Sequence, residues 1–247
     1  MVQAPQRTAF SGPTLIRLLA RLTDVEFTES RQSLSDRLSQ WLHWTDAIAL
    51  STALNRNPSD VTAGAQAFGS PEENECARVR SALANAIVSN NAFAAVKQHR
   101  RTQAPSHGAP MDAAVDYPAF RQGYLSMQQA METDIGNLRG RLREKLAART
   151  PAMTCLAEVD AVMERALNPR ERSLLAAVPG LLRGHFERLR QAEQKTLADT
   201  EASGDTSAVT PGAWLAVFRK DMQSVLLAEL ELRFQPVEGL LAALRTS

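Results

Sequence analysis

The sequence has little of what nucleic-acid binding surfaces usually contain. Aromatic residues make up 5% of its 247 positions, and 28 Lys and Arg residues are nearly matched by 27 Asp and Glu residues, for a net charge of +1. A dedicated nucleic-acid binder is usually visibly basic and often stacks bases on aromatic side chains. The totals therefore argue against nucleic acid as the partner.

Cysteine is also scarce. Cys76 and Cys155 lie far apart and match no closely spaced metal or redox motif. We expect two free, buried thiols in a reducing cytoplasm, because small buried thiols pack like hydrophobic side chains. No apolar run approaches the roughly 20 residues that span a bilayer, and Arg17 and Arg21 interrupt the first apolar segment, which argues against a signal peptide. The expected location is cytoplasmic, with no transmembrane segment.

Recognisable catalytic motifs are missing as well. None of the four histidines has a spacing that would build a metal site on a helix, and there is no glycine-rich phosphate loop or Gly-x-Ser-x-Gly motif. His43 and Asp46 could join a distant His185 in a site, but a polar patch beside Trp41 and Trp44 is the simpler interpretation. We predict no cofactor, no metal and no enzymatic activity, and keep an enzyme assembled from distant residues as the third hypothesis.

What the sequence does contain is a strong helical pattern. Between Pro118 and Arg149, apolar side chains recur at the spacing that places them on one face of an α-helix. The stripe consists of Phe120, Tyr124, Met127, Met131, Ile135, Leu138, Leu142 and Leu146. At about 1.5 Å per residue the segment forms a rod of roughly 45 Å. A stripe so long needs cover from other helices, so we predict an all-α helical bundle with one long amphipathic helix of about 30 residues and no significant sheet.

Prolines mark where other helices begin, because the first helical position needs no amide donor. Helix starts are predicted at Pro13, Pro71, Pro118, Pro151, Pro169 and Pro211. Pro179-Gly180 is expected to interrupt the chain, Pro236 to follow the end of a helix at Phe234, and another helix to end near Leu197. A helical stretch from Arg31 to Leu54, with a break near Thr45-Asp46, should bury Leu34, Leu38, Trp41, Leu42 and Ile48.

These segments suggest three parts. Residues 1–101 form an N-terminal helical region, 102–116 a linker loop with prolines and small residues, and 117–247 a C-terminal helical bundle. Whether the two helical parts pack as one body stays open at this stage. Asp160 lies near a predicted apolar stripe and is expected to be solvated or salt-bridged.

The segment from Pro211 to Phe234 is apolar on two faces. Trp214, Phe218, Val225 and Leu232 share one side, and Leu227, Leu230 and Phe234 project from the other. A helix of this kind is either central in the bundle or carries an interface in addition to its core face. Both interpretations are kept, with the central position favoured.

Basic residues gather at two predicted helix ends. The clusters are Lys97, His99, Arg100 and Arg101, and Arg139, Arg141, Arg143, Lys145 and Arg149. Cations in the last turn complement the helix dipole, so solvated helix ends are favoured over a patch for an acidic partner or nucleic acid. Two Gly-x-x-x-Gly spacings, Gly136/Gly140 and Gly180/Gly184, would permit a close contact between helices.

Four stretches also resemble a known family. They are GPTLIRLLARL (12–22), RQSLSDRLSQWLHWTDAIALSTAL (31–54), LAEVDAVMERALNPRERSLLAAVPGLLRGHFERL (156–189) and AELELRFQPVEGLLAAL (228–244). They resemble an uncharacterised proteobacterial family of about this length, a domain of unknown function, and the last two are the most specific. The resemblance carries over no site residue. It implies a bacterial, helical protein encoded near inner-membrane proton-channel proteins and outer-membrane-anchoring partners, and hence a cytoplasmic accessory of an envelope complex.

The leading functional hypothesis is a non-enzymatic helical scaffold or adaptor that binds another protein, a second copy of itself, or both. Apolar burial would drive the association. Leu227, Leu230 and Phe234 are the predicted interaction residues, with Arg139 and Arg143 as charges at the rim. The alternative hypothesis is a regulatory or nucleic-acid-associated module that uses the basic helix ends.

Overall fold

The computed structural model describes residues 13–23, 32–55, 70–90, 116–203 and 212–246, and most of these residues are helical. Eight helices occur in these ranges: α1 (Thr14–Leu22), α2 (Leu34–Trp41), α3 (Trp44–Leu54), α4 (Ser70–Ser89), α5 (Tyr117–Ala147), α6 (Pro151–Leu175), α7 (Val178–Ser203) and α8 (Ala213–Thr246). No strand is found among them, so the predicted all-α class is confirmed. The predicted linker lies outside the described residues except for Asp116, and so does the first basic cluster.

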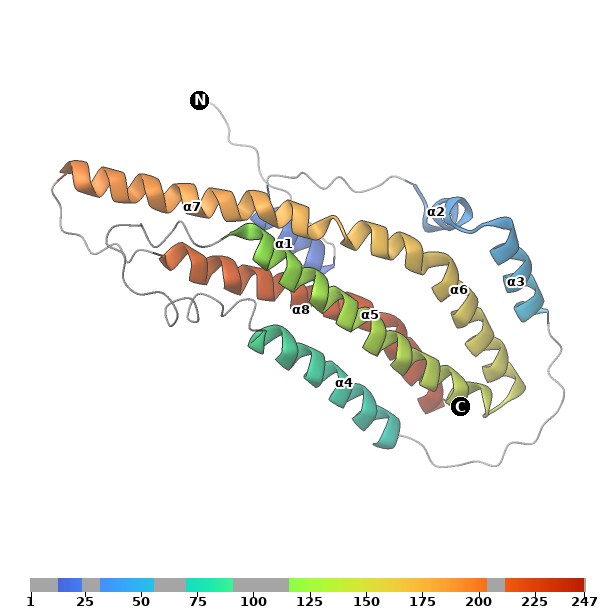
Figure 1. Ribbon diagram of the computed structural model, residues 1–247. Helices are drawn as coiled ribbons and strands as arrows, with labels where there is room; N and C mark the ends of the chain where they lie inside the picture. The colour runs from blue at the N-terminus through green and yellow to red at the C-terminus, as the bar shows by residue number, and fades with distance from the viewer. Residues whose placement is uncertain (1–12, 24–31, 56–69, 91–115, 204–211, 247) are drawn as a thin grey trace, which may run out of the picture.

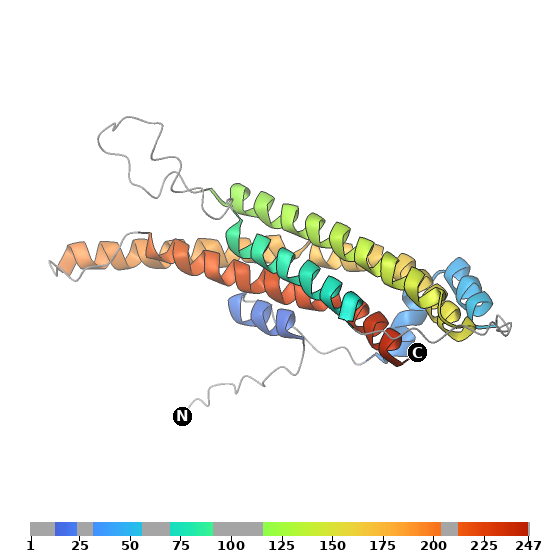
Figure 2. The same cartoon turned by 90° about the horizontal axis from the view of Figure 1, so that it is seen from below.

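The helices form an elongated bundle. Helices α6, α2 and α3 lie on one side of it (Figures 1 and 2), and we call them the outer layer. α5 packs against α8, and α4, α7 and α1 add to this pair. α6 packs on α5, carries α3 on its outer side, and leads into α7 after a bend (Figures 1 and 2). Leu19 of α1, Leu83 of α4 and Leu226 of α8 belong to one hydrophobic core, so N-terminal and C-terminal helices share it.

The long helix α5 matches its prediction closely. It spans 31 residues, has a proline in its first turn and ends at Ala147. All eight side chains of the predicted stripe are buried. At the end of the bundle where α5 begins, Phe120, Phe186 and Phe218 pack edge to face or tilted, with ring centroids 5.0–5.9 Å apart. Such aromatic contacts add to the free energy of apolar burial.

Helix α8 is the central helix of the bundle. It runs without interruption through Pro236, although this proline was predicted to follow the end of a helix. Trp214, Phe218 and Val225 are buried on one side, and Leu230 and Phe234 on the other, each of the last two with 2% of its surface exposed. The central interpretation is therefore confirmed: core packing on both sides retains the helix despite the missing amide of the proline.

The boundaries around α6 and α7 differ from the prediction. Pro169 starts no new helix and lies inside α6. The interruption falls at Ala176 and Ala177, ahead of Pro179, which occupies the first turn of α7. A proline is tolerated there because the amides of a first turn have no partner within the helix. α7 then continues to Ser203, beyond the expected end near Leu197.

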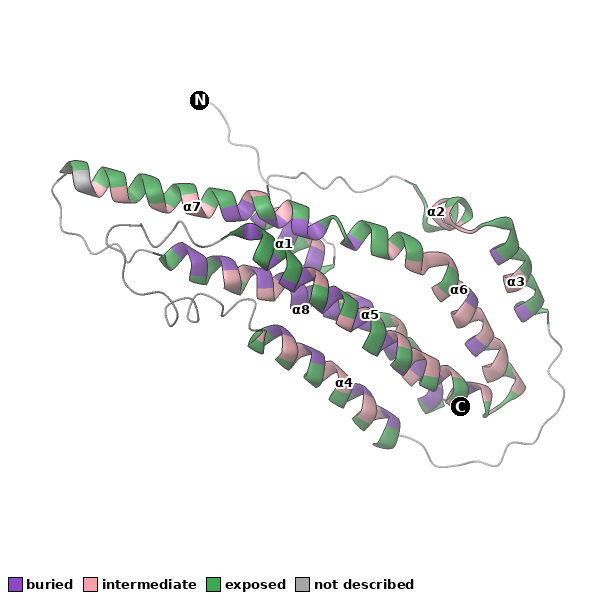
Figure 3. Cartoon of the chain, viewed as in Figure 1, coloured by how far each residue is buried: buried purple, intermediate pink, exposed green. Residues whose placement is uncertain are grey.

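The N-terminal pair α2 and α3 is less buried than predicted. The break between them lies at Leu42 and His43, and the Ser33 hydroxyl caps α2 by accepting the Asp36 amide at 3.1 Å. α2 has no buried residue. Leu34 and Ile48, expected in the core, are exposed, because these helices lie outside the bundle and only one side of α3 is covered (Figure 3).

The two glycine spacings do not mark close helix contacts. A Cβ added at Gly136, Gly140 or Gly180 would meet no other atom within 4 Å, and at Gly184 only the Arg188 guanidinium lies nearby, at 3.7 Å. The close-contact interpretation is therefore wrong.

Replacing Leu138 by Ala should lower the free energy of unfolding by about 2–5 kcal/mol, because Leu138 is fully buried in α5. Leu174→Ala is the matched control, since Leu174 is 60% exposed, and it should change stability by about 0.5 kcal/mol or less. Urea denaturation followed by circular dichroism measures both. Equal losses at the two positions would contradict the burial of the stripe.

Candidate functional site

A buried polar cluster lies between α5 and α8. Glu229 of α8 is fully buried, and its carboxylate accepts hydrogen bonds from the Tyr124 hydroxyl at 2.8 Å and the Gln128 amide at 3.0 Å. Arg233, one turn later on α8, donates its Nε to Glu229 at 2.9 Å and pairs with Glu171 of α6 at 3.3 Å. The charge of Glu229 is thus matched inside the core, as a buried carboxylate requires.

The same cluster holds the bend between α6 and α7. Pro179 has no amide hydrogen, so the Leu175 carbonyl lacks the donor that a continuing helix would supply. The Gln128 amide takes its place, at 3.0 Å from the Leu175 oxygen. The Tyr117 hydroxyl donates to the Pro179 carbonyl. Two side chains of α5 therefore fix the direction in which α6 leaves the bundle.

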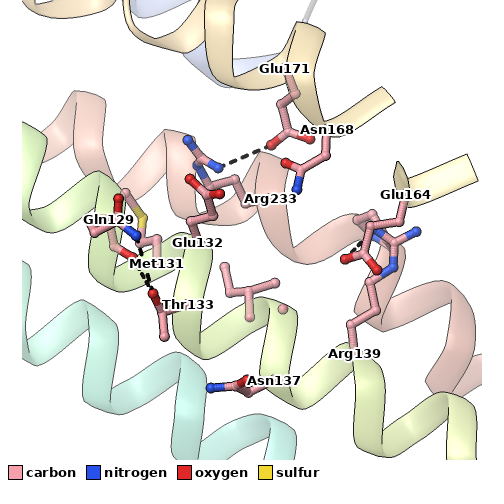
Figure 4. A pocket seen from close by; sticks show the side chains of 13 residues that line it. Gln129, Met131, Glu132, Thr133, Asn137, Arg139, Glu164, Asn168, Glu171 and Arg233 are labelled. Atoms are coloured by element: carbon pink, nitrogen blue, oxygen red, sulfur yellow. Dashed lines mark hydrogen bonds and ion pairs between the residues drawn. The ribbon is translucent and has the colours of Figure 1, made fainter. Parts of the chain in front are cut away.

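An open polar pocket of about 270 Å³ adjoins this cluster between α5, α6 and α8 (Figure 4). Charged side chains from all three helices line it, and Met131 and Ile135 contribute apolar surface. The charged residues are Glu132, Arg139, Glu164, Glu171 and Arg233. Each has an ionic partner within the chain: Glu132 with Arg172, Arg139 with Glu164 at 3.5 Å, and Arg233 with Glu171.

The polar lining of the pocket consists of amides, carboxylates, guanidinium groups and the Thr133 hydroxyl. Among the described residues that line it there is no histidine, cysteine or serine. Its carboxylates face guanidinium groups of the same chain. These ion pairs join α5, α6 and α8 across the pocket.

The second basic cluster is used inside the chain. Arg139 donates two hydrogen bonds to the Asp160 carboxylate of α6, from Nε at 2.9 Å and from Nη2 at 2.6 Å. Arg143 contacts Asp160 at 3.2 Å and also contacts Glu164. The expectation of a salt-bridged Asp160 is confirmed. The predicted role of Arg139 and Arg143 as rim charges needs correction, because both side chains are at most 20% exposed and bind α6.

Two further basic residues of this cluster pair with α4. Arg141 contacts Glu75 at 2.7 Å, and Lys145 contacts Glu72 at 3.0 Å. The ammonium group of Lys145 lowers the pKa of the buried Glu72 carboxyl. These charges therefore join helices instead of forming an open basic surface.

The apolar interaction residues also need correction. Leu230 and Phe234 are buried in the core of the single chain, and Leu227 is partly buried against it. The two-faced pattern of α8 arises because α4 and α1 pack on this helix in addition to α5 and α7. These three side chains do not form an exposed docking surface.

The histidines have local roles. The His43 amide donates to the Asp46 carboxylate at 3.1 Å, which caps the start of α3. His185 is buried, and its Nε2 lies 2.9 Å from the Asp221 carboxylate of α8. His43 and Asp46 thus pair with each other in a helix cap, and His185 pairs with Asp221 instead of with these two residues. No three metal-ligating side chains gather anywhere in the described ranges.

The two cysteines are free, as predicted. Cys76 is buried in α4, where burial raises the pKa of its thiol. Cys155 of α6 is only partly buried, and its thiol lies 3.1 Å from the Ala53 carbonyl at the end of α3. The raised pKa of the Cys76 thiol is the opposite of the lowered pKa that makes a cysteine reactive.

Exposed apolar side chains concentrate on the outer layer. Leu34 of α2 is 71% exposed, and Trp44, Ile48 and Leu54 of α3 are 79%, 49% and 65% exposed. At 100° per residue, the three residues of α3 fall within an arc of about 120°, which we call the α3 face. Buried Asp46 and Ala53 lie on the side of α3 that packs on α6. The sequence did not distinguish the two sides, because α3 is apolar around most of its circumference.

Replacing Glu229 by Leu should lower the free energy of unfolding by about 3–5 kcal/mol, because Arg233 and Gln128 would lose a buried acceptor. Glu231→Leu, at an exposed position two residues later, is the control. Adding Arg233→Met to Glu229→Leu should recover part of the loss, since an unpaired buried charge is then removed. Equal stability of the Glu229 and Glu231 variants in urea denaturation would contradict this role.

The chain has two tyrosines, and burial raises the pKa of both, that of Tyr117 to about 12 and that of Tyr124 well above its ordinary value of 10. Above pH 10 the unfolded chain releases protons that the folded chain keeps, so stability should fall as the pH rises. We expect tyrosinate absorbance to appear in the native protein only with alkaline unfolding, and near pH 10 in denaturant. A native titration near pH 10 would show that a tyrosine is exposed.

Comparison with known proteins gives a family and no assigned function. A family model described as "Protein of unknown function (DUF3348)" matches residues 1–246. No curated protein and no solved structure matches the chain. None of the described helices is long and apolar enough to cross a membrane. The family model covers all four segments on which the resemblance was based, and the chain belongs to the DUF3348 family of uncharacterised proteins.

Proposed function

We propose that this protein is a non-enzymatic helical adaptor that binds another protein through α2 and α3. The observation that carries the proposal is the exposure of Trp44, Ile48 and Leu54 on the α3 face, together with Leu34 of α2. Single exposed apolar residues are normal on any protein, but several on two adjacent short helices are typical of an interaction surface.

The α3 face has the composition of a binding hot spot. Tryptophan is enriched among residues that dominate binding free energy, and covering one such side chain removes roughly 150–250 Å² from water. At roughly 25 cal/mol per Å², burial of Trp44 with Ile48 and Leu54 would contribute several kcal/mol to association. An apolar helix face of the partner would supply the matching surface.

The competing hypotheses receive less support. Four basic residues of the second cluster, Arg139, Arg141, Arg143 and Lys145, pair with carboxylates of the same chain, which leaves them less available to phosphates. The polar pocket has no histidine, cysteine or serine among its described lining residues, and its carboxylates pair with arginines of the same chain. A cytoplasmic location and an accessory role in an envelope complex form part of the proposal, as the family resemblance implied.

Replacing Trp44 and Ile48 by Ser should abolish partner binding without loss of stability, because both side chains are exposed in the single chain. Tagged wild-type and variant chains would be purified from the producing organism and their bound proteins compared by quantitative mass spectrometry. Light scattering of each chain alone would detect self-association. Val217→Ser, at a 49% exposed position of α8, is the matched control.

A partner or self-association lost in the double variant and kept in Val217→Ser would support the α3 face. The same bound proteins and the same molar mass for all three chains would exclude it as the binding surface.

A further inference from the structure

The contact of α6 with the bundle differs in kind from the other helix contacts. Along its 25 residues only Ala157, Val162 and Leu175 are buried. Ion pairs supply much of the remaining contact with α5. We call the central group of four, Arg139, Arg143, Asp160 and Glu164, the clasp.

The clasp is balanced only when α5 and α6 are together. Arg139 and Arg143 are four residues apart on α5, and Asp160 and Glu164 are four residues apart on α6, so each helix alone has like charges facing each other. Across the interface the two pairs neutralise one another, with side chains 14–21% exposed. Each guanidinium contacts both acids, so loss of one acid leaves two partly desolvated guanidinium groups to share one carboxylate. The four residues should therefore engage and release together.

Helices α2 and α3 are attached to α6. α3 packs on α6, and the Cys155 thiol of α6 contacts the Ala53 carbonyl of α3. The Arg170 guanidinium of α6 lies over the Trp41 ring of α2, 5.0 Å from its centroid. In Figures 1 and 2 these three helices form one layer beside α5. Movement of α6 would carry α2 and α3 with it.

Each end of α6 has a hydrogen bond that does not involve the clasp. At its start, the Thr150 hydroxyl caps the helix by accepting the Met153 amide at 3.2 Å, directly after α5 ends. At its end, Leu175 is buried and its carbonyl accepts the Gln128 amide. The stretch between these points faces the polar pocket through Glu164, Asn168 and Glu171.

We propose that α6, α2 and α3 open locally from the bundle as one unit, and that the clasp is the latch that controls this opening. Because Arg139 and Glu164 belong to the clasp and also line the pocket, opening widens the pocket and changes how the α3 face is presented. This inference goes beyond the proposed function and is tested without any partner. Low local stability of this kind is common in elements with few buried apolar contacts.

The test is hydrogen exchange of the intact chain measured by mass spectrometry. In D160N/E164Q, amides of α6 between residues 157 and 171 and amides of α3 should exchange about tenfold faster than in wild type. Amides of α5 and α8 should keep their wild-type rates. E238Q is the matched control, since it breaks an exposed ion pair between α4 and α8 and leaves the clasp intact.

Two further measurements separate the ionic latch from a general loss of packing. High sodium chloride should accelerate exchange in wild-type α6 and α3 by about twofold to fivefold. An apolar replacement of the whole clasp, R139M/R143M/D160L/E164M, should return α6 to slow exchange and remove its salt dependence, because no charge is left unpaired.

The proposal is overturned if wild-type α6 exchanges as slowly as α5 and α8 at every salt concentration. It is also overturned if D160N/E164Q accelerates α5, α6 and α8 together, since that result describes global unfolding. If D160N/E164Q does not fold, the salt dependence of the wild-type chain decides by the same criteria.

Discussion

The structure depends on the apolar contact between α5 and α8. Met131, Leu138 and Leu142 of α5 are almost completely buried, and so are Phe218 and Val225 of α8. A stripe of eight turns requires an equally long partner, and α8 meets this requirement by remaining helical through Pro236. The remaining core helices, α1, α4 and α7, cover what this pair leaves open. Burial on this scale supplies the main driving force for folding.

The polar groups inside this contact follow from the same constraint. A helix pair that excludes water has to satisfy every charge it encloses, and Glu229 does so with donors from Tyr124, Gln128 and Arg233. The Gln128 amide also serves the Leu175 carbonyl that Pro179 leaves without a donor. The Gln128 side chain thus stabilises both the core and the α6–α7 bend. A residue of the bundle therefore helps to fix the direction of α6.

Features that a single segment encodes are predictable from this sequence. Features that depend on contacts between helices are not. The stripe from Phe120 to Leu146 was predictable because its spacing is visible in one segment. Pro236 lies inside α8, against the prediction, because packing on both sides of this helix outweighs the local cost of a proline. Pro169 also lies inside a helix, α6. The roles of Arg139 and Glu229 depend on partners from other helices, which periodicity does not reveal. Leu34 and Ile48 are exposed, against the prediction, because apolar character alone does not show which side of a short helix is covered.

The result is a division between an apolar core and an outer layer of different chemistry. An adaptor needs a body that keeps its shape and a surface that is free to bind. In the proposed adaptor the body is the bundle around α5 and α8, and α6 joins it largely through charged pairs, which tolerate separation in water far better than apolar faces do. Exposed Trp44 and Ile48 lie on the outer layer and not on the core. The proposed binding and the proposed opening both involve this layer, and they leave in place the contacts on which folding depends.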